Sequence, residues 1–533
     1  MKIRSGIAAA ALLSACATSE MNVDPAPACA AVSGTLVQAA DLQASANAPL
    51  QPALPQHCRV IGEIAPVDPK APPIRYQVNL PTQWNGRAVQ YGGGGFNGVL
   101  ITGTALAPAG RPDRPAPLAR GYVTYGTDSG HQNAPGVPLQ AFSLNEEALV
   151  NFAHASYKKV KDVAVALVER RYGRKPERVY FIGSSEGGRE GLTMAQRYPA
   201  DFDGVFSRVP VINWTALQHA GTRNGLAQMG EGWIRPAHVK LVHDAVLAAC
   251  DAADGIADGL VADYAGCLKR FDVMKLRCSG SNAGNTDTCL TEAQIKAVQA
   301  LHSDYRFEFP LANDVRSYPR WPAGGENTPG NFPVGGWRAW FSGDSAPVSP
   351  PAPNNSRAWQ YGSGAIQYFY ARDGNFDLRS YDPGKFRARV QQVSALMDST
   401  NPDLAEFRSR GGKLIVLEHM ADYAQSPYAG IEYYQSVVKR MGQGSVKDFM
   451  RLYVAPGVDH VGTGAPANID MLAVLAAWVE RDQAPEDLEV LQQDRAPPFT
   501  ITRSLPLCRW PAYPHYTGGD SAWAGSYECR VLK

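Results

Sequence analysis

The stretch that most constrains this chain is VYFIGSSEGGR, at residues 179–189. Its four apolar residues, Val179 to Ile182, predict a short buried strand, and residues 187–198 predict a helix with one apolar face. A Gly-x-Ser-x-Gly turn centred on Ser185 joins the two. Such a turn presents the serine at a helix N-terminus, where free N–H groups and the helix dipole favour an anion.

Strand, glycine-flanked turn and helix in this order are typical of the nucleophile elbow of α/β-hydrolases. The pentapeptide on its own also occurs in ordinary strand-to-helix turns. Here further strands alternate with helices, which predicts an α/β fold with a mostly parallel sheet and helices on both faces. The predicted strands are 58–64, 74–80, 88–91, 122–126, 179–182, 203–206, 413–417 and 450–454, and the longest predicted helix is 146–172.

Chain length and charge narrow the possibilities. At 533 residues the chain exceeds one typical domain. Its formal net charge of +1 argues against a nucleic-acid partner. The alternation of strand and helix is lost after about residue 210, in a segment that we interpret as an inserted lid domain. The predicted units are a signal segment 1–16, a tether and strap 17–55, an α/β-hydrolase core 56–210, the lid 211–394 and the rest of the core 395–533.

The N-terminus resembles an export signal. A short basic start precedes the apolar run Ile7 to Leu13, which is too short to span a bilayer. The run ends in Leu-Ser-Ala-Cys, similar to a bacterial lipoprotein signal box, and this predicts lipidation of Cys16. The alternative is an ordinary signal peptide cleaved near Ala17. Both interpretations predict export, to the periplasm or outer membrane as a lipoprotein, or as a secreted protein.

The cysteine count agrees with export. Nine cysteines without Cys16 leave eight, an even number that suits an oxidising compartment. Sequence order predicts four local disulfides: Cys29–Cys58, Cys250–Cys267, Cys278–Cys289 and Cys508–Cys529.

A glycine run at residues 92–95 allows two interpretations. The pattern Gly93-x-Gly95-x-x-Gly98 formally matches a dinucleotide fingerprint, but no convincing helix follows it. The alternative is an oxyanion loop, in which the backbone of Gly93 or Gly94 donates an N–H to the reacting oxygen. We favour the oxyanion loop and expect no organic cofactor.

Two late strands supply the other partners of a serine nucleophile. Asp422 follows the predicted strand 413–417, and His460 follows the last one. Ser, Asp, His is the chain order of α/β-hydrolases. His419 and Asp459 remain rivals for the base and the acid.

The predicted lid carries two candidate binding features. Asp251, Asp254 and Asp258 stand among turn-forming glycines and could converge on a hard cation, although a plain Asp-Gly turn explains them equally well. Arg338 could meet a substrate carboxylate, and Trp337 and Trp340 beside it could line a pocket for an aromatic substrate. Most aromatic residues of this segment fit its own small core.

Taken together, these motifs resemble the tannase and feruloyl esterase family, which includes mono(2-hydroxyethyl) terephthalate hydrolase. The resemblance runs over nearly the whole mature chain, through WNGRAVQYGGGGFNG, TDSGH, GSSEGGREG, YPADFDGV, CDAADGIADGL, GGKLIVLEHMAD, APGVDH and LCRWPAYPHYTGGD. It implies a Ser185–Asp422–His460 triad, oxyanion donors at Glu186 and near Gly93 and Gly94, and esters of aromatic acids as substrates. It also implies a structural Ca²⁺ held in the lid by Asp251, Asp254 and Asp258 with the carbonyls of Ile256 and Leu260.

One departure from this family concerns a disulfide that ties its two catalytic loops together. The corresponding positions here are Ser184 and Val461, so we expect a softer site. The sequence therefore predicts an exported serine esterase acting on a small aromatic ester. The alternative is an exported binding or assembly protein whose hydrolase site is inactive.

Overall fold

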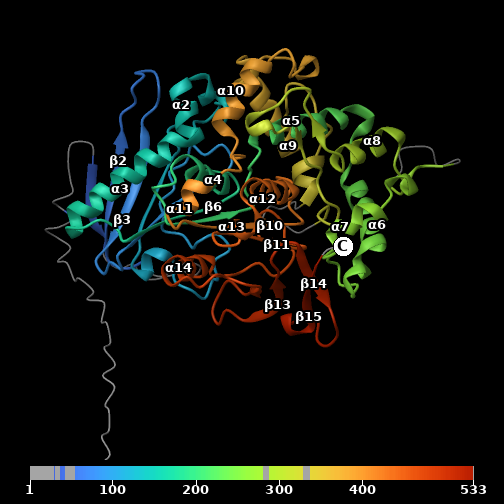
Figure 1. The fold of residues 1–533 in the computed structure, drawn as a ribbon. Coiled ribbons are helices and arrows are strands. Elements are labelled where there is room, and N and C mark those ends of the chain that lie inside the picture. Colours follow the sequence, from blue (N-terminus) through green and yellow to red (C-terminus); the bar gives the residue numbers. More distant parts are fainter. Residues whose placement is uncertain (1–28, 30–36, 43–53, 280–286, 328–335, 532–533) are drawn as a thin grey trace, which may run out of the picture.

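A nine-stranded mixed sheet forms the centre of the fold, in the order β1-β2-β3-β5-β4-β6-β7-β10-β11 (Figure 1). The computed structural model describes residues 29, 37–42, 54–279, 287–327 and 336–531. The sheet strands are β1 Val37–Leu42, β2 His57–Ile64, β3 Ile74–Pro81, β4 Arg87–Tyr91, β5 Val123–Thr127, β6 Arg178–Ser184, β7 Gly204–Arg208, β10 Lys413–His419 and β11 Met450–Ala455. The strands from β5 to β11 in this order are all parallel to their neighbours: β5 with β4, β4 with β6, β6 with β7, β7 with β10 and β10 with β11. This confirms the predicted fold class.

Helices cover both faces of the sheet, so its central strands are apolar on both sides. Val179 and Phe181 of β6 pack toward α4 and α12, whereas Tyr180 and Ile182 pack toward α14. The covering helices are α3 (Ser156–Tyr172), α4 (Glu186–Arg197), α12 (Tyr428–Met441) and α14 (Met471–Arg481). The predicted helix 146–172 consists of α2 (Glu146–Val150), a π turn at Asn151–Ala155 and α3.

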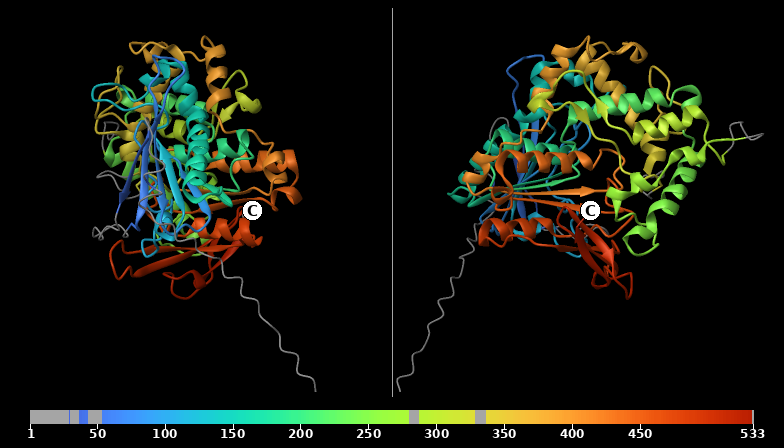
Figure 2. Two further views of the ribbon diagram at one scale, coloured as in Figure 1. Left: turned by 90° about the vertical axis from the view of Figure 1, so that its left-hand side faces the viewer. Right: turned by 45° about the vertical axis from the view of Figure 1, so that its right-hand side comes forward.

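A mostly helical segment lies between β7 and β10 and adds no strand to the main sheet (Figure 2). Its two ends lie together, because Ser399 N donates to Ile212 O at 2.9 Å and Thr215 N donates to an Asp398 oxygen at 2.7 Å. Its apolar core also takes in Phe96, Leu149 and Phe152, so the segment packs directly on the rest of the fold. Its longer elements are α5 (Trp214–Ala227), α6 (Pro236–Cys250), α7 (Tyr264–Arg270), α8 (Glu292–Leu301), a π turn (Arg338–Ser342), α9 (Arg357–Gly364) and α10 (Arg387–Met397).

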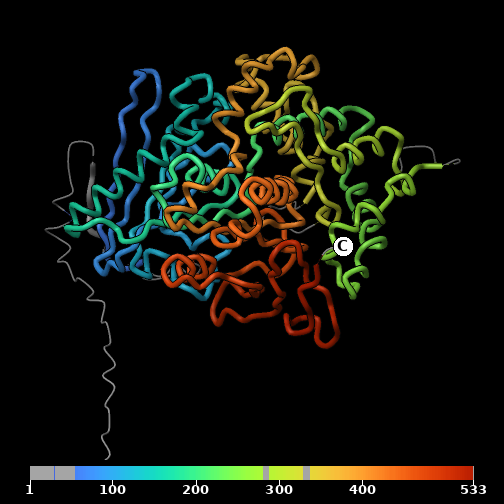
Figure 3. Tube along the Cα trace, in the orientation of Figure 1, coloured from blue at the N-terminus to red at the C-terminus, as the bar shows by residue number. Residues whose placement is uncertain are grey.

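Two small antiparallel hairpins follow β11, and sequence periodicity did not reveal them (Figure 3). Their strands are half exposed and interrupted by Pro506 and Pro514, so they lack a clean apolar alternation. The strands are β12 Leu488–Gln493, β13 Ile501–Leu507, β14 Ala512–Tyr516 and β15 Tyr527–Val531. Among the described residues, no helix has the length and apolar character to cross a membrane.

Four disulfides link the eight cysteines in the pairs that sequence order predicts, Cys29–Cys58, Cys250–Cys267, Cys278–Cys289 and Cys508–Cys529. The predicted signal segment, with Cys16, lies outside the described residues.

Candidate active site

The turn between β6 and α4 holds Ser185 in a conformation that non-glycine residues rarely adopt, with φ 61° and ψ −122°. Both flanking glycines are required by close backbone approach. A Cβ on Gly183 would lie 2.0 Å from the carbonyl oxygen of Gly187, and one on Gly187 would lie 2.7 Å from that of Gly93. The motif therefore folds as a nucleophile elbow, with the serine between the strand and the helix N-terminus.

Three residues that are distant in sequence form a hydrogen-bonded chain at this turn. His460 Nε2 lies 2.9 Å from Ser185 Oγ, and His460 Nδ1 lies 2.7 Å from Asp422 Oδ2. Ser185, Asp422 and His460 follow β6, β10 and β11, whose parallel C-terminal ends meet at one edge of the sheet. The arrangement can transfer a proton from the serine to the imidazole.

The carboxylate of Asp422 is buried and fully hydrogen-bonded. Its Oδ1 accepts from Ala424 N at 2.7 Å and Gln425 N at 3.1 Å, and its Oδ2 also accepts from Gln425 Nε2 at 3.2 Å. Because Asp422 accepts at both oxygens, we assign the imidazole proton to His460 Nδ1, which faces Asp422, so that Nε2 faces the serine.

The rival histidine and acid shape the loop around His460 instead. The ring of His419 is buried, and its Nδ1 bonds to the carbonyl oxygen of Asp459 at 2.6 Å. The Asp459 carboxylate accepts from the backbone N–H groups of Val461, Gly462 and Thr463.

The glycine run lies against the elbow, because Gly187 N donates to Gly93 O at 3.1 Å. Glu186 supplies the first N–H of α4, a position without an intrahelical acceptor. The N–H groups of Gly93 and Gly94 each donate to a side chain, Glu190 at 2.8 Å and Asn97 at 2.5 Å. A Cβ on Gly94 would meet no atom within 4 Å, so open space adjoins this residue.

The residues after the glycine run form no helix as far as the short 3₁₀ turn at Pro117–Arg120. The run therefore lacks the strand–loop–helix unit of a dinucleotide site.

A layer of buried charge supports the elbow and the glycine run. Glu190, fully buried, accepts from Gly93 N and from Asn97 Nδ2 at 2.6 Å, and Tyr157 donates a very short hydrogen bond to it. Arg189, also fully buried, forms an ion pair with Glu186 at 2.5 Å. Burial raises the pKa of both glutamates, and the pKa of Glu186 reaches about 7.

Aromatic side chains flank His460. The ring of Trp340 lies 6.5 Å from the imidazole, that of Tyr423 lies 6.2 Å from it, and the two rings are 5.9 Å apart. Tyr361 extends this wall, 5.5 Å from Trp340 and 5.2 Å from Phe96. Trp340 was predicted as a substrate contact, and Tyr361 is one of the lid aromatics considered for such a pocket; Tyr423 was missed, because no motif marks it.

The two other predicted substrate contacts lie elsewhere. Trp337 is buried in the core of the inserted segment, against His302 and Phe341. Arg338 is exposed and forms an ion pair with Asp344 at 3.3 Å.

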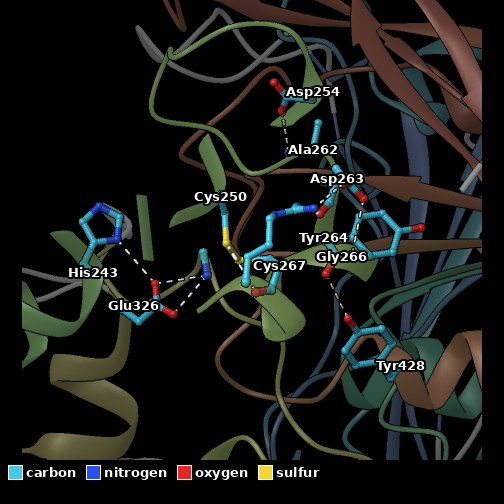
Figure 4. Close-up of a disulfide and its surroundings, with 12 residues drawn as sticks. His243, Cys250, Asp254, Ala262, Asp263, Tyr264, Gly266, Cys267, Glu326 and Tyr428 are labelled. Carbon is cyan, nitrogen blue, oxygen red and sulfur yellow. Dashed lines mark hydrogen bonds and ion pairs between the residues drawn. A yellow bond between two sulfur atoms is a disulfide. The ribbon is translucent and has the colours of Figure 1, made fainter. Parts of the chain in front are cut away.

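The acidic loop at residues 251–260 lies within the segment that the Cys250–Cys267 disulfide closes (Figure 4). Asp254 is buried; its side chain accepts from Ala262 N at 2.8 Å, as Figure 4 shows. Burial raises the pKa of Asp254 to about 7, and the charges of Asp258 and Asp251 add to the increase. Asp258 forms an ion pair with Arg503 at 2.5 Å.

The loop offers the carboxylate and carbonyl oxygens that Ca²⁺ prefers, but Asp258 already pairs with Arg503. Its carboxylates bond to loop amides, since Asp251 accepts from Asp258 N at 3.2 Å and Gly259 N at 3.1 Å. In the part of the chain that the structure describes, no three His, Cys, Asp or Glu side chains gather as a metal centre. Calcium therefore stays a prediction.

Comparison with known sequences gives consistent matches. A family model described as tannase and feruloyl esterase matches residues 58–530. An uncharacterized esterase of Agrobacterium fabrum is 40% identical over 487 residues, covering 89% of this chain and 85% of the relative. The mono(2-hydroxyethyl) terephthalate hydrolase of Piscinibacter sakaiensis is 32% identical over 530 residues, covering 90% of this chain and 85% of the relative.

Solved structures agree on the fold. Feruloyl esterase B from Aspergillus oryzae matches with a TM-score of 0.77 at 22% identity, covering 95% of this chain and 99% of that one. Tannin acyl hydrolase from Aspergillus niger matches with a TM-score of 0.72 at 21% identity, covering 95% and 94%. At this identity the likeness establishes the fold, which is that of an α/β-hydrolase.

Proposed function

The chain belongs to the tannase and feruloyl esterase family and is an ester hydrolase, and on that premise we propose that it cleaves esters of aromatic acids through Ser185, His460 and Asp422. The observation that carries the proposal is the hydrogen-bonded chain from Ser185 Oγ through both imidazole nitrogens to Asp422.

In the proposed first step, His460 Nε2 accepts the hydroxyl proton of Ser185 while the serine oxygen attacks the ester carbonyl. Asp422 holds the imidazole in the required tautomer and stabilises the imidazolium that forms. His460 then returns the proton to the departing alcohol, which leaves an acyl-enzyme. Water, deprotonated by the same imidazole, attacks the acyl-enzyme and releases the acid.

The negative oxygen of the tetrahedral intermediate needs hydrogen-bond donors. The N–H of Glu186 is suited to this role by its place at the helix N-terminus. The glycine run is the source of the second donor that we propose. Because Gly93 N and Gly94 N already donate to side chains, donation by either requires that it exchange its present acceptor for the substrate oxygen.

Two observations support an aromatic acyl group. Trp340, Tyr423 and Tyr361 form a wall of rings next to His460, and such rings stack favourably on a planar acid. The curated relatives include a mono(2-hydroxyethyl) terephthalate hydrolase and a probable feruloyl esterase of Arthroderma benhamiae. We propose a ferulate, gallate or terephthalate monoester as the substrate class.

A Ca²⁺ ion, if bound, would be held by Asp251, Asp254 and Asp258 with the carbonyls of Ile256 and Leu260. It would neutralise the acidic loop beside the C-terminal hairpins, to which Arg503 belongs. Four disulfides agree with an oxidising, extracytoplasmic location. We propose export through the N-terminal signal, with Cys16 as a candidate lipid anchor.

The test is hydrolysis of methyl ferulate, methyl gallate, mono(2-hydroxyethyl) terephthalate and p-nitrophenyl acetate by the wild type and by Ser185→Ala. Turnover of an aromatic ester that the substitution abolishes supports the proposal. Turnover of the acetate alone would overturn the aromatic assignment. Labelling of Ser185 by a fluorophosphonate separates an active esterase from a binding protein, since labelling requires an activated serine.

A further inference from the structure

We propose that Arg208 is a positioning residue that holds the nucleophile and the catalytic histidine in a fixed relative position. The inference rests on the proposed triad. Arg208 is the last residue of β7, which runs between β6 and β10. In these pairings Arg208 lies opposite Ser184 on one side and Leu417 on the other. It therefore stands at the edge of the sheet where the three triad residues emerge.

The guanidinium of Arg208 contacts both catalytic segments. Its Nη1 donates to Ser184 Oγ at 3.0 Å, and its Nη2 donates to the carbonyl oxygen of His460 at 3.2 Å. Its own carbonyl oxygen accepts from Ser185 N at 3.0 Å. One residue thus bonds to the nucleophile, to the residue before it and to the backbone of the histidine.

Burial strengthens these hydrogen bonds. Arg208 is 8% exposed, and hydrogen bonds from a cation are stronger than neutral ones where water is excluded. Burial lowers the pKa of Arg208 to about 10, against the charges of Asp422 and Asp459, so the side chain remains a cation at neutral pH. The guanidinium presents its two Nη donors in a rigid planar fork, whereas a lysine ammonium is a point charge on a flexible stem, so lysine can replace it only in part.

The histidine loop closes directly on the guanidinium. A Cβ on Gly462, whose φ is 92°, would lie 2.8 Å from Arg208 Nη2. The stretch after His460, which includes Gly462, is held by Asp459, whose carboxylate accepts from the N–H groups of Val461, Gly462 and Thr463. Arg208 thus ties the histidine loop, through the carbonyl oxygen of His460, to Ser184 at the end of the strand that precedes the nucleophile.

The experiment compares Arg208→Met, Arg208→Lys and Ser184→Ala with the wild type. Arg208→Met should lower kcat by about tenfold or more with KM within about twofold, because a small misplacement of the base slows chemistry without removing substrate contacts. The rate of fluorophosphonate labelling should fall in parallel. Arg208→Lys should restore part of kcat, and Ser184→Ala, which removes one of the two side-chain contacts, should give an intermediate loss.

Arg451 provides a matched control. It is also 8% exposed, lies in β11, and donates to Pro485 O at 2.9 Å, with no hydrogen bond to the triad. Arg451→Met should lower the melting temperature and leave kcat of the folded enzyme unchanged. The proposal is overturned if Arg208→Met keeps the wild-type kcat, or if it changes only KM.

If Arg208→Met does not fold, Ser184→Ala decides: an unchanged kcat and labelling rate there would also overturn the proposal. An unlabelled wild type would instead overturn the proposed function itself, so the two failures are distinct.

Discussion

The indole ring of Trp340 lies 6.5 Å from the imidazole of His460, although the two residues belong to different parts of the fold. Trp340 belongs to the helical segment inserted between β7 and β10, and His460 follows β11. The inserted segment therefore places an aromatic ring beside the proposed catalytic base, where it is positioned to contact the acyl group of the proposed substrate.

Trp340→Ala should raise KM for the preferred aromatic ester by about two- to tenfold, the equivalent of one lost ring contact. The KM for p-nitrophenyl acetate should change less. Trp337→Ala is the control, since Trp337 packs in the core of the same segment. It should lower the melting temperature and leave the preference between the two esters intact. Equal losses on both esters in Trp340→Ala would contradict a role in acyl recognition.

Asp422→Asn should lower kcat by about 10⁴-fold, because the amide can stabilise the wrong imidazole tautomer and cannot stabilise the imidazolium. Steady-state kinetics on the preferred ester would measure the loss. Asp459→Asn, in the rival acid, should affect mainly the order of the loop at Val461 to Thr463, and kcat should fall far less. The reverse ranking would assign the acid to Asp459.

Glu190→Gln should lower kcat by about tenfold or more with little change in KM. The carboxylate accepts from Gly93 N, Asn97 and Tyr157, and an amide would face one of these donors with its own N–H₂. The glycine run would then shift relative to the reacting oxygen. Tyr157→Phe removes one donor and keeps the carboxylate. Steady-state kinetics of both variants would show how much of the loss of kcat is due to the carboxylate itself. A wild-type kcat in Glu190→Gln would show that the run does not depend on this anchor.

Asp398 should make the protein less stable as pH rises from about 4 to 6. Burial raises its pKa from 3.8 to about 6, so in this window the folded state retains a proton that the unfolded state has lost. The difference in unfolding free energy is at most about 3 kcal/mol. Asp398→Asn should flatten the decline in thermal unfolding measured across this range.

Asp403 offers a control of opposite sign. The hydrogen bond from Arg440 lowers the pKa of Asp403 in the folded protein. Asp403 therefore stabilises the folded state at pH values above its pKa in the unfolded chain, and this stabilisation is lost as pH falls through its pKa in the folded protein. Asp403→Asn should therefore leave the decline between pH 4 and 6 in place. A decline as steep in Asp398→Asn as in the wild type would assign it to other buried carboxyls whose pKa is raised, such as Glu186 and Asp254.

Removal of divalent cations with EDTA should lower the melting temperature, and Ca²⁺ should restore it. A ligand at about 100 times its Kd stabilises the folded state by about 2.7 kcal/mol. Asp254→Asn should abolish the response, because Asp254 is the buried carboxylate of the acidic loop. Asp244→Asn, on the exposed side of α6, is the control and should retain the response. A melting temperature indifferent to Ca²⁺ in the wild type would refute the calcium proposal.

Much of the core could be predicted from sequence, because its strands are short apolar runs bounded by turn residues. The strand around Phe181, the elbow at Ser185 and the later strands before Asp422 and His460 lie where the motifs place them. The C-terminal hairpins could not be found this way, since half-exposed strands broken by Pro506 and Pro514 carry no clear period.

The support of the site was the harder part to predict. Ser184 and Val461 lack the disulfide that the family resemblance leads us to expect, and from this we expected a softer site. Arg208 bonds to Ser184 and to the backbone next to Val461. Nothing in the sequence around Arg208 marks it, because its role depends on the parallel pairing of β7 with its neighbours. Whether the loops at 185 and 460 exchange hydrogen faster than the core strands stays a prediction.

The insertion between β7 and β10 also sets the order in which the enzyme can become active during synthesis. Ser185 and His460 are 275 residues apart, and β10, the direct partner of β7, leaves the ribosome only after residues 209–412 have been made. Until then one edge of β7 has no neighbour and the nucleophile has no base. Under the proposed mechanism, a chain that ends before His460 therefore carries the serine but lacks its base, and it cannot cleave esters through the triad.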